Sequence, residues 1–209
     1  MRILTTLTFL ALTTVFCSAQ QFEGKITYEV SYESKNPQLP NEQLQAMMGS
    51  KQEYTIKDGN YKSVVNGAFM QWQLYRQEDN KLYNKMANSE AALWNDGAVN
   101  ADSLIDFKVN KDVVEILGYS CDELILNCKS GVQKYYVNSK IAVDSKLYEN
   151  HKFGNWYMFL EKSKSLPLKM VVDNAQFSMT STASSVEPSE LSESDFELPE
   201  DMPTAKSPY

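Results

Sequence analysis

Residues 51–86, KQEYTIKDGNYKSVVNGAFMQWQLYRQEDNKLYNKM, decide the fold class of this chain. Short β-rich runs are separated by turn signals, of which Asp58-Gly59 and Asn66-Gly67 are the strongest. Asp-Gly and Asn-Gly tolerate the positive backbone angles of tight hairpins, so each pair predicts a turn between two antiparallel strands. The stretch therefore predicts a β-meander.

The run FMQWQLYR within this stretch carries apolar bulk on both faces. Met70, Trp72 and Leu74 fall at alternate positions and share one face, whereas Phe69 and Tyr75 lie on the opposite face. Alternate residues of a strand share a face. Other parts of the protein are therefore expected to cover both sides of the sheet here.

Strand patterns continue on both sides of the meander. In FEGKITYEVSYES, one face of a half-buried strand is expected to carry Ile26, Tyr28, Val30 and Tyr32. Further strands are expected in VVEIL, DELILNC, VQKYYV, NWYMFLEK, LPLKMVV and AQFSMTSTASSV. Residues 87–112 fit either strand or helix and are left open. The prediction is a mainly β protein with a single domain at 20–186.

One short amphipathic helix is expected at residues 41–49, NEQLQAMMG. Asn41 suits the N-cap, where its side chain accepts a backbone N–H, and Gly49 suits the end of the helix. The apolar residues Leu44, Met47 and Met48 fall on one face at helical spacing. The helix is therefore expected to form a small lid on the sheet.

The first 19 residues, MRILTTLTFLALTTVFCSA, have the composition of a secretory signal peptide. A membrane anchor is disfavoured because the apolar run is shorter than the roughly 20 residues that span a bilayer. Lipidation at Cys17 is a minority alternative, since Phe16 stands where a lipoprotein signal has a small residue. We expect an exported protein whose mature chain has no transmembrane anchor.

Residues 187–209 form an acidic tail rich in Pro, Ser and Glu. The tail is expected to be solvated and partly extended, with Phe196 and Leu198 as its points of attachment. The net charge of the chain is -7, and no basic cluster occurs in the sequence. Because nucleic acid binding depends on clustered Lys and Arg, nucleic acid is not an expected partner.

The two cysteines of the mature chain, Cys121 and Cys128, flank the apolar run DELILN. If that run is one strand, their Cα atoms lie roughly 23 Å apart, whereas a disulfide spans roughly 6 Å. We therefore expect two buried free thiols.

Catalytic chemistry finds little support in the sequence. The chain has one histidine, His151, in a loop-like segment, and neither cysteine has a nearby cation that would stabilise a thiolate. The spacings typical of zinc sites, calcium loops and phosphate-binding loops do not occur. No catalytic residue, metal or cofactor is therefore predicted. A hydrolase built on two carboxylates remains a remote alternative.

Several segments, in their order along the chain, resemble those of exported Gram-negative envelope proteins with the LolA/LolB-like fold, in particular the DUF4412-type branch. These segments are FEGKITYEV, ILGYSC, KYYVNSKI, SLPLKM and DFELP. The resemblance implies an open antiparallel half-barrel with a small helical lid over an apolar concave face. It also implies binding of a lipid or a lipoprotein acyl chain, and a location in the periplasm, at the outer membrane or outside the cell.

These observations lead to one functional hypothesis and two alternatives. The hypothesis is a non-enzymatic envelope protein that binds an apolar ligand in the concave face of the half-barrel. The alternatives are an interaction or scaffold protein that meets an envelope protein partner through its tail or a sheet edge, and the hydrolase. The residues expected to line the apolar cavity are Ile26, Tyr28, Val30, Tyr32, Leu44, Met47, Met48, Met70, Trp72 and Leu74.

Overall fold

A computed structural model describes residues 21–208 of the chain. The expected signal peptide at 1–19 lies outside the described residues. The helices are α1 (Asn41–Met48) and α2 (Trp156–Ser163), with 3₁₀ turns at Ser145–Tyr148, Phe153–Asn155 and Glu193–Phe196. The strands are β1 (Gly24–Ser34), β2 (Lys51–Lys57), β3 (Asn60–Val65), β4 (Met70–Arg76), β5 (Lys81–Met86), β6 (Ala92–Asp96), β7 (Leu104–Ile116), β8 (Tyr119–Cys128), β9 (Gly131–Ala142), β10 (Ser165–Asn174), β11 (Phe177–Pro188) and β12 (Thr204–Lys206).

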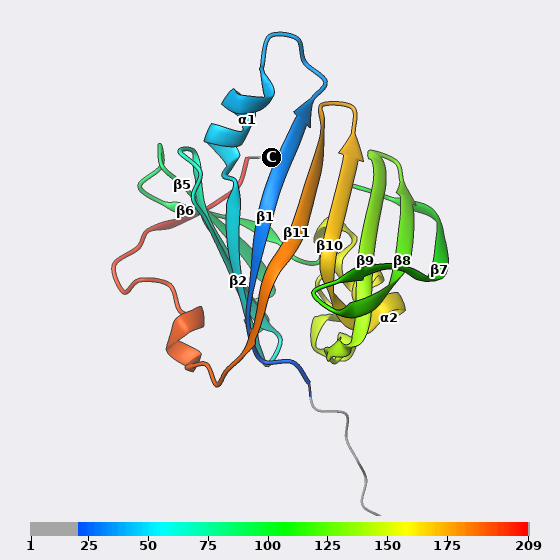
Figure 1. Ribbon diagram of the computed structural model, residues 1–209. Helices are drawn as coiled ribbons and strands as arrows, with labels where there is room; N and C mark the ends of the chain where they lie inside the picture. Colours follow the sequence, from blue (N-terminus) through cyan, green and yellow to red (C-terminus); the bar gives the residue numbers. More distant parts are fainter. Residues whose placement is uncertain (1–20, 209) are drawn as a thin grey trace, which may run out of the picture.

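These strands form one open sheet in the order β12-β6-β5-β4-β3-β2-β1-β11-β10-β9-β8-β7. Neighbouring strands are antiparallel, apart from β12 and β6, which run parallel. In Figure 1 the sheet curves without closing, α1 lies beside β1 and β2, and α2 lies behind β9 and β10. The predicted open half-barrel with a small helical lid is confirmed.

The two turn signals of the meander work in different ways. At Asp58-Gly59 both residues have positive φ, 44° and 83°, and the turn joins β2 to β3 as predicted. At Asn66-Gly67 the chain makes a longer loop, in which the Asn66 side chain accepts the backbone N–H groups of Ser50 and Lys51. A Cβ on Gly67 would lie 2.6 Å from the Met47 carbonyl oxygen, so glycine lets this loop pass close to α1.

The helix at 41–49 is present, but Asn41 is not its cap. Pro40 precedes the helix, and the Asn41 side chain accepts the backbone N–H of Ser34 at 2.8 Å, which ties α1 to the end of β1. Gly49 ends the helix with φ 99°, and its N–H donates to the Gln45 carbonyl. The predicted end is therefore confirmed, and the predicted capping role of Asn41 is wrong.

The prediction of a strand at NWYMFLEK is also wrong, because this segment forms α2. Trp156, Phe159 and Leu160 are spaced for one helical face, and that face packs on the core. Asn155 and Lys164 have positive φ at either end of the helix and turn the chain out of the strand direction. The open segment 87–112 contains strand β6 and the first part of β7.

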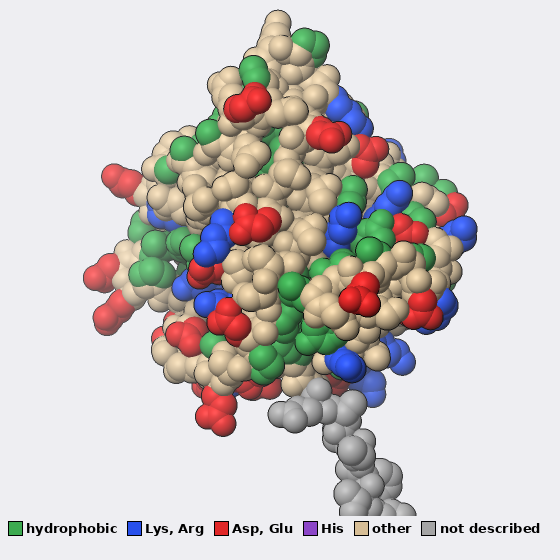
Figure 2. Space-filling view, viewed as in Figure 1, with side chains coloured by type: hydrophobic (Ala, Val, Ile, Leu, Met, Phe, Trp, Pro, Cys, Tyr) green, Lys and Arg blue, Asp and Glu red, His purple; other side chains and the backbone are tan. Residues whose placement is uncertain are grey.

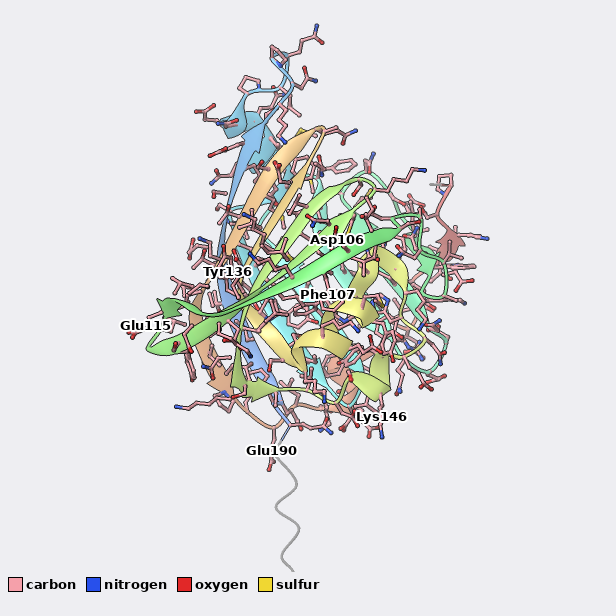
Figure 3. The ribbon with its side chains drawn as sticks, turned by 90° about the vertical axis from the view of Figure 1, so that its right-hand side faces the viewer. Asp106, Phe107, Glu115, Tyr136, Lys146 and Glu190 are labelled. Carbon is pink, nitrogen blue, oxygen red and sulfur yellow. The ribbon has the colours of Figure 1, made fainter. Side chains whose placement is uncertain are left out.

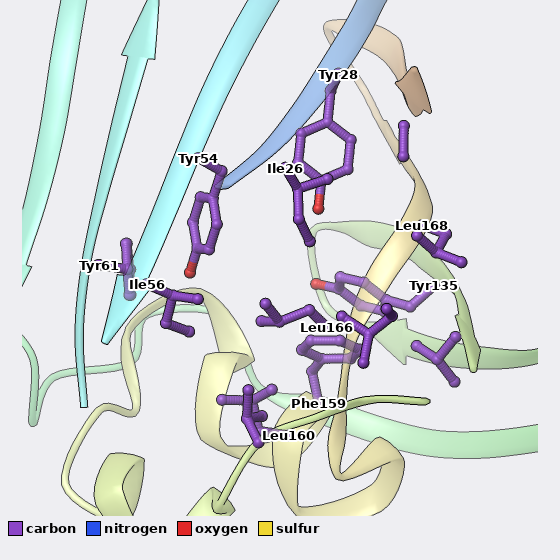
Figure 4. Close-up of a cluster of buried hydrophobic side chains, with 14 of the residues drawn as sticks. Ile26, Tyr28, Tyr54, Ile56, Tyr61, Tyr135, Phe159, Leu160, Leu166 and Leu168 are labelled. Carbon is purple, nitrogen blue, oxygen red and sulfur yellow. The ribbon is translucent and has the colours of Figure 1, made fainter. Parts of the chain in front are cut away.

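The main core lies between the concave face of the sheet and the helices. Its fully buried side chains include Ile26 and Leu166 from the sheet and Phe159 and Leu160 from α2, which Figure 4 shows meeting in one cluster. Figure 2 shows one side of the molecule, where scattered acidic and basic side chains surround several patches of hydrophobic side chains. The main core itself lies on the inner side of the sheet.

A smaller core lies on the opposite face of the sheet, beneath the C-terminal tail. Leu74, Tyr83 and Ala92 pack there against Phe196, with Leu198 alongside. The tail acids are exposed, and Phe196 is buried against the sheet. The sheet itself extends beyond residue 186, because β11 runs to Pro188 and β12 lies in the tail.

Both cysteines are buried and free, as expected. Cys121 and Cys128 lie on the same strand, β8, which separates them along its length. Burial raises the pKa of both thiols, that of Cys128 to about 11. Both therefore stay protonated at neutral pH.

Candidate functional site

A cavity of about 270 Å³ opens on the concave side of the sheet, next to the segment 151–156 that leads into α2. Strands from both halves of the sheet contribute to its wall. The lining residues are Tyr28, Gln52, Tyr54, Tyr61, Ser63, Gln73, Leu82, Gln133, Tyr135, His151, Phe153, Gly154, Trp156, Pro167, Met170, Val172 and Ser181. None of these described residues is Asp, Glu, Lys or Arg.

Aromatic rings form the floor of this cavity. Tyr61 lies at the centre of the group, with ring centroids 5.2 Å from Tyr54, 5.7 Å from His151 and 5.5 Å from Trp156. The imidazole of His151 also stacks on Tyr75 at 3.9 Å. The sheet supplies Tyr54, Tyr61 and Tyr75, whereas the segment 151–156, which ends at the first residue of α2, supplies His151 and Trp156. The cavity therefore forms only when this segment docks on the sheet.

His151 is part of this floor and is not a simple loop histidine. Its side chain is 1% exposed, and its Nε2 lies 2.8 Å from the Tyr61 hydroxyl. Burial lowers the pKa of His151 from 6.5 to about 3, because the charged imidazolium would lose its hydration here. The ring is therefore neutral at physiological pH.

The polar groups of the cavity fall into a paired and an unpaired set. The Tyr28 hydroxyl donates to the Pro167 carbonyl at 2.7 Å, and the Tyr135 hydroxyl donates to Gln133 at 3.0 Å. Figure 4 shows these two rings pointing from the sheet toward α2, with Tyr54 beside them. The hydroxyls of Tyr28 and Tyr135 therefore already have hydrogen-bond partners within the protein.

Among residues 21–208, three buried polar atoms of residues that line the cavity have no hydrogen-bond partner: the Tyr54 hydroxyl, His151 Nδ1 and Trp156 Nε1. A buried polar group without a partner costs about 1–3 kcal/mol. Most such groups in folded proteins are paired, so three of them around one cavity single it out as a candidate binding site.

A second cavity of about 540 Å³ adjoins the first, and both have Gln73 and Phe153 in their walls. The second cavity lies toward β5 and β6, where Met86, Leu93 and Val99 contribute apolar surface. A molecule too long for the first cavity could thus contact the apolar surface of the second one as well.

The ten residues expected to line one apolar surface do not lie together. Tyr28 lines the cavity, and its neighbours on β1, Ile26, Val30 and Tyr32, are buried in the main core. Leu44 of α1 is buried there too, Met48 packs against it, and Met47 is half-buried. The β1 face therefore points inward, but of its four residues only Tyr28 lines the cavity.

The placement of Trp72 and Leu74 in the same cavity is wrong, because both belong to the core beneath the C-terminal tail. A register shift separates Met70, which pairs with Met86, from Trp72, which pairs with Lys85. This bulge breaks the two-residue alternation on which a shared face for Met70, Trp72 and Leu74 was based.

The sequence analysis missed the tyrosines of β2 and β3, His151 and Trp156. Tyr54 alternates with Ile56 in KQEYTIK, so its inward position had a signal. No sequence signal placed His151 and Trp156 there, because their positions depend on how the segment 151–156 docks on the sheet.

Among residues 21–208, no group of three or more His, Cys, Asp or Glu side chains is arranged to hold a metal ion. No helix in the same range is long and apolar enough to cross a bilayer.

No family model and no curated protein matches the chain. One similar solved structure is that of PNGF-II, with 13% identity and a TM-score of 0.49, covering 88% of this chain and 31% of that one. Another is an uncharacterised conserved protein from Thermus thermophilus, with 7% identity and a TM-score of 0.47, covering 88% and 91%. This chain thus spans less than a third of PNGF-II. The resemblance to LolA/LolB-like and DUF4412-type proteins stays a prediction.

Proposed function

We propose that this protein is an exported, non-enzymatic envelope protein that binds an apolar ligand, a lipid or acyl chain, in the concave cavity of its half-barrel. The observation that carries the proposal is the cavity itself, whose described lining residues are mainly aromatic and aliphatic, with some neutral amides and hydroxyls and no charged side chain. Burial of an acyl chain contributes roughly 0.8 kcal/mol for each methylene, so such a wall binds without an ion pair.

The cavity does not favour the hydrolase alternative. That reaction needs two carboxyl groups on either side of the bond that breaks. The described lining residues include no Asp or Glu, and neutral hydroxyls and amides take their place. The non-enzymatic proposal therefore fits the chemistry of this wall.

The proposal is tested by purifying the protein from the cell envelope, expressed with its own first 19 residues and without detergent. Native mass spectrometry and solvent extraction then identify any bound lipid. A stoichiometric lipid is expected. A protein that is empty and stays empty after incubation with envelope lipids would overturn the proposal.

A charge placed in the cavity wall is expected to prevent binding. Met170 lines the cavity, whereas its neighbour Val171 points to the other side of β10, and both are half-buried. Met170→Lys is therefore expected to weaken lipid binding at least about tenfold, because a buried ammonium lacks a partner there. Val171→Lys, the matched control, is expected to bind as the wild type does. Equal binding by both variants, measured by lipid titration, would place the ligand elsewhere.

The edge strand β7 favours the interaction function as a second candidate. Its outer edge has no neighbouring strand in the described sheet, and Ile105, Phe107 and Val109 are 71%, 47% and 43% exposed. Figure 3 shows this strand along the rim, with Asp106 and Phe107 near its beginning and Glu115 at its far end. An exposed apolar edge pairs readily with another strand.

The occupant that β7 fits is a second copy of the same strand. Antiparallel pairing about Phe107 sets Asp106 opposite Lys108 of the second copy, so each charge meets its opposite. Sedimentation equilibrium is expected to give a dimer, which Asp106→Lys weakens and the swap Asp106→Lys with Lys108→Asp restores. A monomer at every concentration would exclude this candidate.

A further inference from the structure

We propose that the ligand is an uncharged acyl compound, an ester or an amide, whose carbonyl oxygen accepts hydrogen bonds from Tyr54, His151 and Trp156. This inference rests on the proposed function and specifies its ligand. It is carried by three polar atoms that the fold buries in one wall and leaves without partners.

All three unpaired groups act as donors. The indole Nε1 of Trp156 can only donate, and the Tyr54 hydroxyl carries a hydrogen of its own. The Tyr61 hydroxyl has one hydrogen bond among the described residues, to His151 Nε2. It is satisfied best when it donates to Nε2, which leaves the hydrogen of the neutral imidazole on Nδ1. The missing partner is therefore an acceptor.

The donors belong to side chains whose rings surround that of Tyr61, so they are neighbours in the wall. The ring centroids of Tyr54 and His151 each lie 6.4 Å from that of Trp156. Each unpaired atom is buried. A ligand oxygen could contact them only after the segment 151–156 shifts on the sheet, and we expect binding to include this adjustment.

The acceptor is uncharged because the wall offers nothing to neutralise an anion. The described lining residues include no Lys or Arg, and the Asp102 carboxylate lies 3.5 Å from the lining residue Gln133. A carboxylate or phosphate would lose its hydration beside a like charge. A carbonyl oxygen avoids this cost. An ester or amide attached to an acyl chain also suits the apolar surface that continues toward Met86 and Leu93.

Three probes of equal chain length separate the contributions: methyl decanoate, ionised decanoate and decane, each displacing protein-bound Nile red. Methyl decanoate is expected to bind about tenfold more tightly than either decane or decanoate. A tenfold difference in affinity corresponds to the free energy of about one hydrogen bond to a buried donor. Displacement of Nile red by decane shows that the cavity binds an apolar chain. The higher affinity of the ester measures the hydrogen bonds from the three donors.

Tyr54→Phe is expected to remove most of the preference for the ester while leaving decane binding unchanged. The same variant is expected to raise the unfolding temperature by about 2–4 °C, because it deletes a buried hydroxyl without a partner. Trp156→Phe keeps an aromatic ring, removes the indole N–H, and serves as a second variant. Tyr83→Phe, on the opposite face of the sheet, is the control and should leave both affinities unchanged.

The outcomes distinguish the inference from the function on which it rests. An ester that binds no better than decane, or a preference that survives both Tyr54→Phe and Trp156→Phe, would overturn the ligand class while the apolar cavity stands. Failure of all three probes to displace Nile red would overturn the proposed function. An unchanged or lowered unfolding temperature for Tyr54→Phe, together with no ester preference, would show that the donors hold a trapped water, which also overturns the inference.

Discussion

Phe159→Ala is expected to lower the free energy of unfolding by about 3–5 kcal/mol, the range for removing a fully buried phenylalanine. The Phe159 side chain is 0% exposed. Its ring centroid lies 4.0 Å from that of Tyr135, on which it stacks, and 5.2 Å from that of Trp156. Its removal leaves a void between α2 and the sheet, which neighbouring side chains cannot fill. Urea denaturation with a linear extrapolation measures the change.

Met158→Ala on the same helix is the matched control. Met158 is half-buried and lies outside the main core, so a loss below about 1 kcal/mol is expected. Similar losses for the two variants would show that α2 does not pack on the sheet through Phe159.

The second large effect is a loss of stability in mild acid that depends on His151. Its pKa is about 3 in the folded protein and 6.5 in the unfolded chain, so the unfolded state binds more protons between these values. The stability that the neutral His151 contributes is therefore fully present above pH 6.5 and is lost as the pH is lowered toward 3. Between pH 7.5 and 5 the wild type is expected to lose about 2 kcal/mol, at 1.36 kcal/mol for each unit.

His151→Phe isolates this effect, because His151 is the only histidine of the chain. The variant keeps a ring on Tyr75 and has no group that titrates with imidazole, so its stability should be nearly constant from pH 7.5 to 5. Carboxyl groups with lowered pKa values, such as Asp122 and Asp173, contribute mainly at lower pH. Parallel pH profiles for wild type and variant would contradict the burial of a neutral histidine.

The meander and the inward face of β1 could be read from the sequence because each depends on neighbouring residues. Asp58-Gly59 sets its own hairpin, and the alternation from Ile26 to Tyr32 survives in the core. The order of the strands could not be read in this way. The pairing of β1 with β11 joins residues at opposite ends of the domain, and no local pattern encodes it.

The candidate site was predicted less well for the same physical reason. Trp72 and Leu74 face the tail because Gln73 and Tyr75 take the inner face of β4, and alternation alone does not show which face points inward. NWYMFLEK has apolar residues at both strand and helix spacing, and the positive φ of Asn155 and Lys164 decides between them. His151 reaches the cavity only through this turn, so its role was outside the reach of sequence reasoning.

The central pairing of β1 with β11 also governs how the chain folds. The hairpins from β2 to β6 involve near neighbours, but Ile26 must find Val186 before the two halves of the sheet are joined. Contacts between distant residues carry a large entropic cost before any gain is realised, and they slow folding. The first strand is therefore expected to stay unpaired on one side until β11 joins it, late in folding.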